Sequence, residues 1–500
     1  MFHCVDHVSI TQIDMQIRTQ SIRLFVCDMK ASESLSTRDV ATDTEDPVFN
    51  GQSRDGGCIG WLVVLGSHVC NLFVFGVSQA IGPLFVVVQR HFEESSARTS
   101  WILAFLISVQ FLLGPLSNVC VKKIGFRMTV MLGTIISSTG YFLSAFANRI
   151  EILYFSLGLV VGFGYALITP ACIGIVAFFI RKKFAVANVL AGCGAGLAVF
   201  IFPPLLQALI DNYGWRGSVI VFSALNAQMA ISAALFRAPE EVNSKSDESE
   251  QTSGEAKGLK LLLSRTADTC DFWLFKMYPT FVLFTVASTI SIGIGYYGLP
   301  AHLVARAENK NLGSGADIAL IVSLMGLAGI IGRLVIPLIL HFTQKCMSTV
   351  KVYALTLCFA GLCNLASPLA KNYVSYMIYA SVLGIPVGTF FGLVPQVVRD
   401  IVGSDFLTAG AGMTSFCVAI GSLIGPPCGG YIYDVTTDYN NSFYFYGSLL
   451  TVGGLMIIVL EPYTTRRQRK AESTTRLTLS NLDLDKVCVA EVATQTGVNS

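Results

Sequence analysis

Long apolar runs separated by short polar segments occupy the chain from about residue 60 to residue 460. A helix rises about 1.5 Å per residue, so about 20 apolar residues cross the hydrocarbon core of a bilayer. The pattern predicts an all-α polytopic membrane protein with twelve spans in two groups of six. The first six are expected at 60–88, 100–120, 128–147, 152–178, 185–210 and 215–237, and the second six at 274–304, 316–342, 350–369, 373–398, 407–431 and 441–461.

Three polar segments divide the chain. Residues 1–54 and 462–500 are predicted to be tails, and 238–271 a linker, because none of them shows apolar periodicity. The predicted organisation is therefore a six-helix bundle at 55–237 and a second six-helix bundle at 272–461. The first tail has no apolar core of the kind found in signal peptides, so we expect no cleaved signal sequence.

A short internal repeat supports the division into two bundles. Pro203-Pro204 is followed after six residues by Asp211, and Pro426-Pro427 is followed after six residues by Asp434. Each copy lies in the fifth predicted span of its half. Proline is common in membrane helices, but repeated spacing at matching positions is typical of carriers built from two related halves.

Composition excludes several functional classes. The 500 residues are 53% hydrophobic and only 13% charged, about half the charged share of soluble domains. The net charge of +2 and the scattered basic clusters predict no nucleic-acid partner. The 14 cysteines form no CxxC pair or Cys/His cluster, so we expect free thiols, no metal and no cofactor. No span carries paired carboxylates, HExxH or GxSxG, which argues against an enzyme, and no ring of like charges predicts a channel.

Basic residues favour one side of the predicted membrane. With the N-terminus inside, the inner loops and the start of the tail hold thirteen Lys and Arg, against seven in the outer loops. The positive-inside rule then places both tails and the linker in the cytoplasm. We expect a multi-pass protein of the plasma membrane.

Several motifs resemble those of the monocarboxylate transporter family, which belongs to the major facilitator superfamily. Asp55-Gly56-Gly57 followed by Trp61 is similar to the signature that opens the family's first helix, although Cys58 and Ile59 replace an aromatic residue there. Three later stretches add to the resemblance: Lys122-Lys123-Ile124-Gly125-Phe126-Arg127 after the second span, Arg181-Lys182-Lys183 before the fifth, and Tyr213-Gly214-Trp215-Arg216 before the sixth. The resemblance covers about 60–460. It implies the facilitator fold, and we assign these loop residues to topology and gating.

Arg333 is the leading candidate for substrate binding, as the only basic residue well inside a predicted span. A charge at that depth costs about 2.5–3.5 kcal/mol on insertion scales and usually faces the bundle interior. The planar guanidinium matches a carboxylate. Snorkelling to the inner surface, or pairing with a neighbouring helix, is the alternative explanation. The resemblance favours the binding role, because family members carry a substrate-binding arginine in this eighth span.

The sequence departs from the proton-coupled lactate carriers of the family at two positions. Gly329 stands four residues before Arg333, where those carriers have Asp, and Gln79 stands where they have a Lys in the first span. His68 is the one histidine that we place in the interior of a span, so it is the candidate for proton coupling. It could equally be hydrogen-bonded between helices. We therefore favour a facilitative carrier.

Asn71, Tyr296 and Phe391 complete the predicted binding site with Gln79 and Arg333. A ligand needs a few convergent polar groups in an apolar pocket, although amides also join helices and aromatics also pack. The favoured function is transport of a small carboxylate-bearing metabolite by alternating access. A proton-coupled symporter that uses His68 and a non-transporting nutrient sensor on a carrier scaffold remain open. The resemblance adds a single-span immunoglobulin-like chaperone as a partner besides the substrate and the lipid bilayer.

Overall fold

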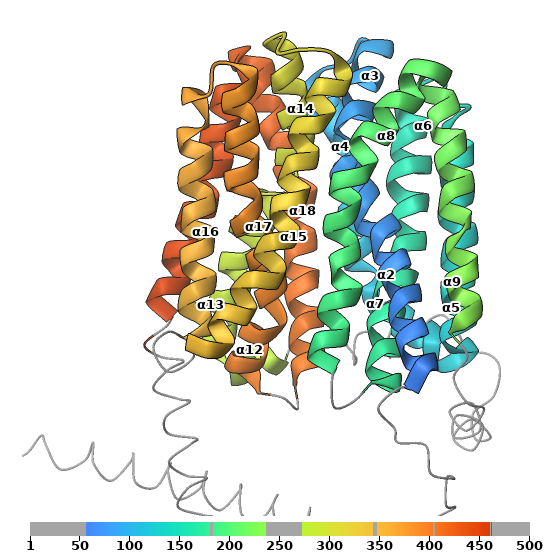
Figure 1. Ribbon diagram of the computed structural model, residues 1–500, viewed down its shortest axis with the longest axis vertical. Coiled ribbons are helices and arrows are strands. Elements are labelled where there is room, and N and C mark those ends of the chain that lie inside the picture. Colours follow the sequence, from blue (N-terminus) through green and yellow to red (C-terminus); the bar gives the residue numbers. More distant parts are fainter. Residues whose placement is uncertain are drawn as a thin grey trace, which may run out of the picture. The chain divides into compact units, whose positions relative to one another are not determined.

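The computed structural model describes residues 57–180, 184–236, 273–343, 348–403, 406–460 and 462. The predicted linker 238–271 and both predicted tails, apart from residue 462, lie outside these residues, as do Asp55, Gly56 and the basic cluster 181–183. All the regular elements of the described part are helices (Figure 1).

The first half of the chain contains α2 (Gly57–Ala80), α3 (Gly82–His91), α4 (Ser96–Leu112), α5 (Gly114–Ser144), α6 (Ile150–Leu153), the π-helix η1 (Tyr154–Val160), α7 (Val161–Phe179), α8 (Phe184–Ala227) and α9 (Met229–Leu235). The second half contains α12 (Trp273–Met277), α13 (Pro279–Ser288), the π-helix η2 (Thr289–Ile294), α14 (Leu299–Asn309), α15 (Gly315–Thr343), α16 (Thr349–Ala366), the 3-10 turn η3 (Ser367–Leu369), α17 (Tyr373–Val402) and α18 (Leu407–Thr436). A final helix follows at Tyr439–Leu460.

Two glycines divide helices that are otherwise too long for one crossing. Among the described residues, nine helices are long and apolar enough to cross a membrane, and α4 with α5 forms a tenth, bent segment. The stretch Val186–Leu235 has 50 residues and would be about 75 Å long, more than twice the hydrocarbon thickness. Gly125 in α5 (φ 79°, ψ 166°) and Gly214 in α8 (φ 67°, ψ 171°) break these segments in a backbone region open essentially to glycine alone. With both breaks, the described helices are consistent with the predicted twelve spans.

The first span of each half is interrupted near its middle. The first span breaks between α2 and α3 at Ile81, just before Pro83, which lacks the N–H of a continuous helix. The seventh span breaks after η2, where residues 295–298 form turns before α14. The predicted end of that span at residue 304 was too early, because α14 continues to Asn309.

The two halves meet along two helix pairs, α4 with α18 and α8 with α15, and α14 also packs on α3. Within the second half, glycines bring α15 and α17 together: a Cβ at Gly388 would lie 1.8 Å from the carbonyl oxygen of Gly329. Such small-residue contacts are typical of helices in membranes, where close packing replaces the hydrophobic effect between helices.

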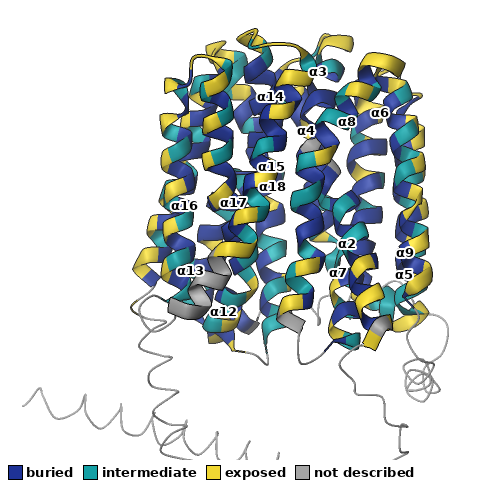
Figure 2. Ribbon diagram, in the orientation of Figure 1, coloured by how far each residue is buried: buried dark blue, intermediate teal, exposed yellow. Residues whose placement is uncertain are grey.

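Exposed residues lie along the outer faces of the helices (Figure 2), and many of them have large apolar side chains. Ile135, Phe155 and Ile378 are each 60% exposed, and each belongs to a helix that also contains buried residues. An exposed apolar surface of this kind suits lipid and would be a liability in water. The fold is therefore that of a polytopic membrane protein, as the apolar pattern predicts.

Candidate functional site

A small cavity lies between the two halves of the chain. It is lined by residues from α2 and α8 of the first half, and from the break in the seventh span, α15 and α17 of the second half. Four of the five predicted binding residues line it: Gln79, Tyr296, Arg333 and Phe391. The other lining residues are small or apolar: Ala195, Gly196, Val199, Met325, Gly326, Gly329, Val387 and Gly388.

Arg333 is the one charged side chain in this lining. One of its terminal N–H groups donates a hydrogen bond to the backbone carbonyl of Gly192, which lies across the boundary between the halves in α8. The side chain packs beside Gly192 and Gly392, where an added Cβ would lie in ordinary contact with it, 3.7 Å from a terminal nitrogen and 3.4 Å from Cγ respectively. The cation therefore enters the cavity without a carboxylate partner among the residues that line it, and an anionic ligand would complement it.

Gln79 and Tyr296 form a second contact between the halves. The hydroxyl of Tyr296 donates a hydrogen bond of 2.9 Å to Oε1 of Gln79, and both side chains are buried. Gln79 comes just before the break in the first span, and Tyr296 lies in the break of the seventh. Interrupted helices at the binding site are a recurring feature of secondary transporters.

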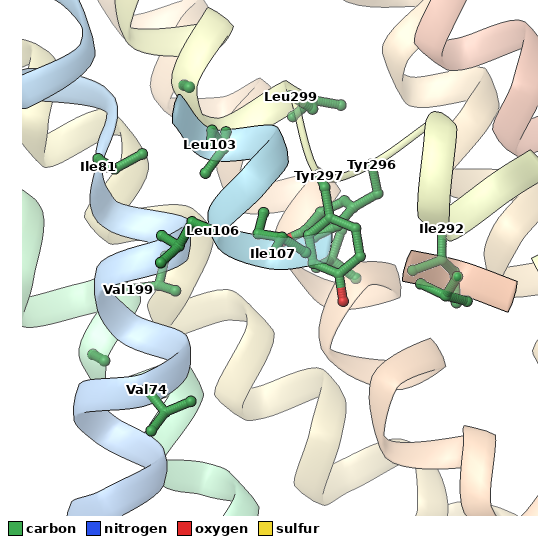
Figure 3. Packing of buried hydrophobic residues seen from close by; sticks show 14 of the residues in the cluster. Val74, Ile81, Leu103, Leu106, Ile107, Val199, Ile292, Tyr296, Tyr297 and Leu299 are labelled. Atoms are coloured by element: carbon green, nitrogen blue, oxygen red, sulfur yellow. The ribbon is translucent and has the colours of Figure 1, made fainter. Parts of the chain in front are cut away.

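Aromatic rings form one wall of the cavity. The ring of Tyr296 lies edge-on to those of Phe391, at a centroid distance of 5.3 Å, and Phe390, at 5.6 Å. Tyr297 packs beside Tyr296 and reaches Phe111 of α4 at 5.9 Å (Figure 3). Only Tyr296 and Phe391 of this group line the cavity, so the others fix the positions of these two rings.

The cavity is narrow in this conformation. It leaves about 30 Å³ for the centres of water molecules, which is room for one or two waters. Water fits in that space, and a metabolite of several heavy atoms does not. Binding therefore requires the two halves to move apart around the site.

Two predicted residues lie elsewhere. The side-chain amide of Asn71 donates a 2.9 Å hydrogen bond to the carbonyl of Ser67 on its own helix, and Asn71 does not line the cavity. Nδ1 of His68 lies 2.8 Å from the carbonyl oxygen of Leu190 in α8, and His68 is also absent from the lining. The geometry of His68 is that of a histidine hydrogen-bonded between helices.

The predicted motif residues lie outside the cavity as far as they are described. Trp61 is 41% exposed on the first turns of α2, close to Gly57 with its positive φ of 39°. Lys122 and Lys123 are exposed near the turn at Gly125, and Arg127 follows it. These residues surround helix ends, which agrees with a role in topology.

Two buried side chains were missed by the sequence analysis. His302 is fully buried in α14, so His68 is not the one histidine inside a span. Arg306 is also buried, although it lies in the last turn of α14 and not well inside the span. Arg306 donates to Oγ of Ser367 at 2.9 Å and to Oδ1 of Asn440 at 2.6 Å. The predicted end at residue 304 left Arg306 outside the span and placed His302 at its edge, although the apolar residues on either side of them gave a usable signal.

The halves are joined by polar contacts at the end of the helices where α3, α6 and α14 lie, which we call the α14 end (Figure 1). Asp434 of α18 accepts hydrogen bonds of 2.9 Å from the backbone N–H groups of Ser96 and Ala97, at the start of α4. Arg90 and Glu308 form an ion pair of 2.6 Å between α3 and α14. These contacts hold the α14 end closed.

Comparison with known proteins agrees with this architecture. The sequence model of the Major Facilitator Superfamily matches residues 68–368 and 336–490. Similar solved structures include the peptide transporter POT in complex with sulfate, with a TM-score of 0.62, 14% identity, and coverage of 81% of this chain and 95% of that one. A POT family transporter in complex with 5-aminolevulinic acid gives a TM-score of 0.63 at 14% identity, covering 83% and 98%. The family model places the chain in the Major Facilitator Superfamily, and the solved structures share its fold.

Similar sequences identify the family within this superfamily. Monocarboxylate transporter 13 of Rattus norvegicus is 30% identical over 419 residues, covering 83% of this chain and 91% of its own. Monocarboxylate transporter 12-B of Danio rerio is 28% identical over 438 residues, covering 83% and 90%. The chain belongs to the monocarboxylate transporter family of the Major Facilitator Superfamily.

Proposed function

We propose that this protein carries small monocarboxylates or related metabolites across the plasma membrane by alternating access. The observation that supports this most is the position of Arg333, the single charge in a cavity between two halves. A cation there would bind one carboxylate by a bidentate pair of hydrogen bonds. Rocking of the halves would then expose the same site to each side in turn.

The neighbouring residues have separate roles in this proposal. Gln79 and Tyr296 offer an amide and a hydroxyl to the polar part of the substrate, exchanging their mutual hydrogen bond of 2.9 Å for bonds to the ligand. Phe391 and the ring of Tyr296 cover its carbon skeleton. The relatives are named monocarboxylate transporters, which supports a carboxylate as the anchoring group.

We propose a facilitative mechanism. The described residues that line the cavity include no carboxylic acid and no histidine that could carry a proton with the substrate. Gly329 and Gln79 occupy the positions of the acid and the lysine in the proton-coupled carriers of the family. A symport mechanism through His68 would need its bond to the Leu190 carbonyl to open in one conformation.

We further propose that the α14 end faces outward and that both tails and the linker are cytoplasmic, because the basic loops favour the opposite end. A single-span immunoglobulin-like chaperone remains a proposed partner. It rests on the family resemblance.

Uptake of labelled lactate, pyruvate and a panel of amino acids into cells at external pH 6 and 7.5 tests the proposal. Arg333→Gln should abolish the flux, whereas Arg149→Gln, which removes an exposed arginine at the start of α6, should leave it unchanged. Uptake that follows the proton gradient and is lost in His68→Gln would establish symport instead. A protein at the surface that binds these compounds without any flux would be the sensor.

A further inference from the structure

His302 is a buried imidazole that joins the two halves. It is fully buried in α14, and its Nε2 lies 3.1 Å from Oγ of Ser100 in α4. Its Nδ1 lies 3.0 Å from the hydroxyl of Tyr446 in the final helix. One nitrogen is therefore bound within its own half and the other across the boundary.

The surroundings of His302 are uncharged. Phe85 of α3 packs on the ring at 5.5 Å, and Tyr439 and Tyr446 of the final helix each at 5.8 Å. Cys428 of α18 lies near Tyr446, and the carboxylates of Asp434 and Glu308 lie near Tyr439. Both carboxylates are engaged, Asp434 with the start of α4 and Glu308 with Arg90.

A charge on His302 would therefore be buried without a partner in the closed state. A neutral imidazole offers one donor and one acceptor, which the two hydroxyls satisfy. An imidazolium would have to be stabilised in an apolar site that provides no anion, at a high energetic cost. The closed α14 end thus selects the neutral ring.

Opening of the α14 end would expose His302 and change its hydrogen bonds. Alternating access, the function proposed above on which this inference rests, requires α4 and α14 to separate there, which breaks the Ser100–His302 contact. The freed nitrogen then faces water, where an imidazole titrates near pH 6.5.

We propose that His302 is a proton-binding site of the gate at the α14 end. The proton enters from that side onto the nitrogen that Ser100 leaves, and it must return to the same side before the gate closes. Protons on that side therefore favour the open gate without being carried across. This separates pH sensitivity from proton coupling.

The size of the effect follows from the titration. If the ring binds a proton only in the open state, with an ordinary pKa, the ratio of open to closed gates rises about tenfold between pH 7.5 and pH 5.5. Below about pH 5 the imidazole of the open state is fully charged. The ratio of open to closed gates should then stop rising only if other groups titrate.

The distance between two spin labels shows whether the gate at the α14 end is open or closed, and no substrate is needed. Arg149 and Lys371 are exposed at the α14 end, one in each half. Each is replaced by a ketone-bearing amino acid, which is then joined to a spin label. The native cysteines stay intact. Pulsed electron resonance on the protein in lipid nanodiscs, frozen at pH 7.5 and 5.5, then gives the share of long and short distances.

We expect the long-distance share, relative to the short, to rise about tenfold at pH 5.5 in the unmodified protein. His302→Gln keeps a donor and an acceptor but cannot bind the proton, so its ratio should change less than about twofold. His68→Gln, the matched control, should keep the full response. A tenfold response in His302→Gln, or none in the unmodified protein, would overturn the proposal.

Ser100→Ala provides a second test that leaves His302 in place. Loss of the cross-half hydrogen bond should raise the open share at both pH values and keep the tenfold ratio between them. A ratio that does not change with pH in this variant also overturns the proposal. Because no substrate is present, a pH-dependent gate in a protein that transports no carboxylate would refute the proposed function and leave this inference standing.

Discussion

Replacing Asp434 by Asn should weaken the closed gate in a predictable way. The carboxylate accepts two backbone hydrogen bonds of 2.9 Å at the start of α4, where the unpaired N–H groups of the first turn point. The asparagine side chain retains one acceptor oxygen and turns a donor toward the second N–H. The variant therefore loses one charge-assisted bond and the favourable charge at a helix N-terminus.

The cost can be estimated from these two losses. A hydrogen bond to a charged group contributes about 1.5–3 kcal/mol, and a charge at a helix end about 0.3–1 kcal/mol. Because Asp434 is only half-buried, we take a total of about 2 kcal/mol, which shifts the ratio of open to closed gates about 30-fold. The spin-label pair at positions 149 and 371 measures this ratio directly.

The internal repeat supplies the control. Asp211 follows the other proline pair, but its carboxylate accepts from Gln207 on the same helix, at 2.8 Å. Asp211→Asn should therefore leave the gate unchanged. An Asp434→Asn variant with the unmodified distance distribution, or an equal shift in Asp211→Asn, would refute the reasoning.

Three further outcomes are expected. Gly214→Ala should lower the free energy of unfolding by about 1–3 kcal/mol, because the backbone there has a φ of 67°. Gly412→Ala on α18, where an added Cβ meets nothing within 4 Å, should not lower it. Thermal unfolding in detergent compares the two variants. Gly329→Asp should make carboxylate uptake faster at acid pH, because the new carboxylate pairs with Arg333 unless it is protonated. A Cβ at this position would lie 3.5 Å from its nearest neighbour, so the substitution fits. Uptake that is equal at pH 6 and 7.5 would contradict this prediction. Asn440 begins Asn440-Asn441-Ser442, which fits the sequence pattern for N-glycosylation. Both the oxygen and the nitrogen of its side-chain amide are hydrogen-bonded, so it should carry no glycan. Treatment with glycosidase should therefore leave the electrophoretic mobility of the protein unchanged.

The sequence predicted the fold class, and four of the five residues proposed to bind substrate line one cavity, because the bilayer restricts where apolar and charged residues can lie. Apolar length determines the crossings, and a buried cation such as Arg333 is conspicuous in an apolar helix. Gln79 was identified through the family resemblance, because it stands at the position of a lysine in the first span. Tyr296 was one of the polar groups within the predicted spans that could line a cavity.

The direction in which a side chain points could not be read in the same way. Asn71 shares a helix with Gln79 but bonds to its own backbone, which the sequence does not reveal. His302 and Arg306 were missed because an interrupted span makes its end hard to place. Their burial depends on α3, α4 and the final helix, which are distant in sequence.

Stabilisation of the purified protein by ligands is the most direct test of the central claim that Arg333 binds a carboxylate. Lactate and pyruvate are compared with their amides, which keep the shape but lack the charge. We predict that the acids raise the unfolding temperature and the amides do not, and that Arg333→Gln loses the effect while Arg149→Gln keeps it. Equal stabilisation by the amides, or an undiminished effect in Arg333→Gln, would contradict the account.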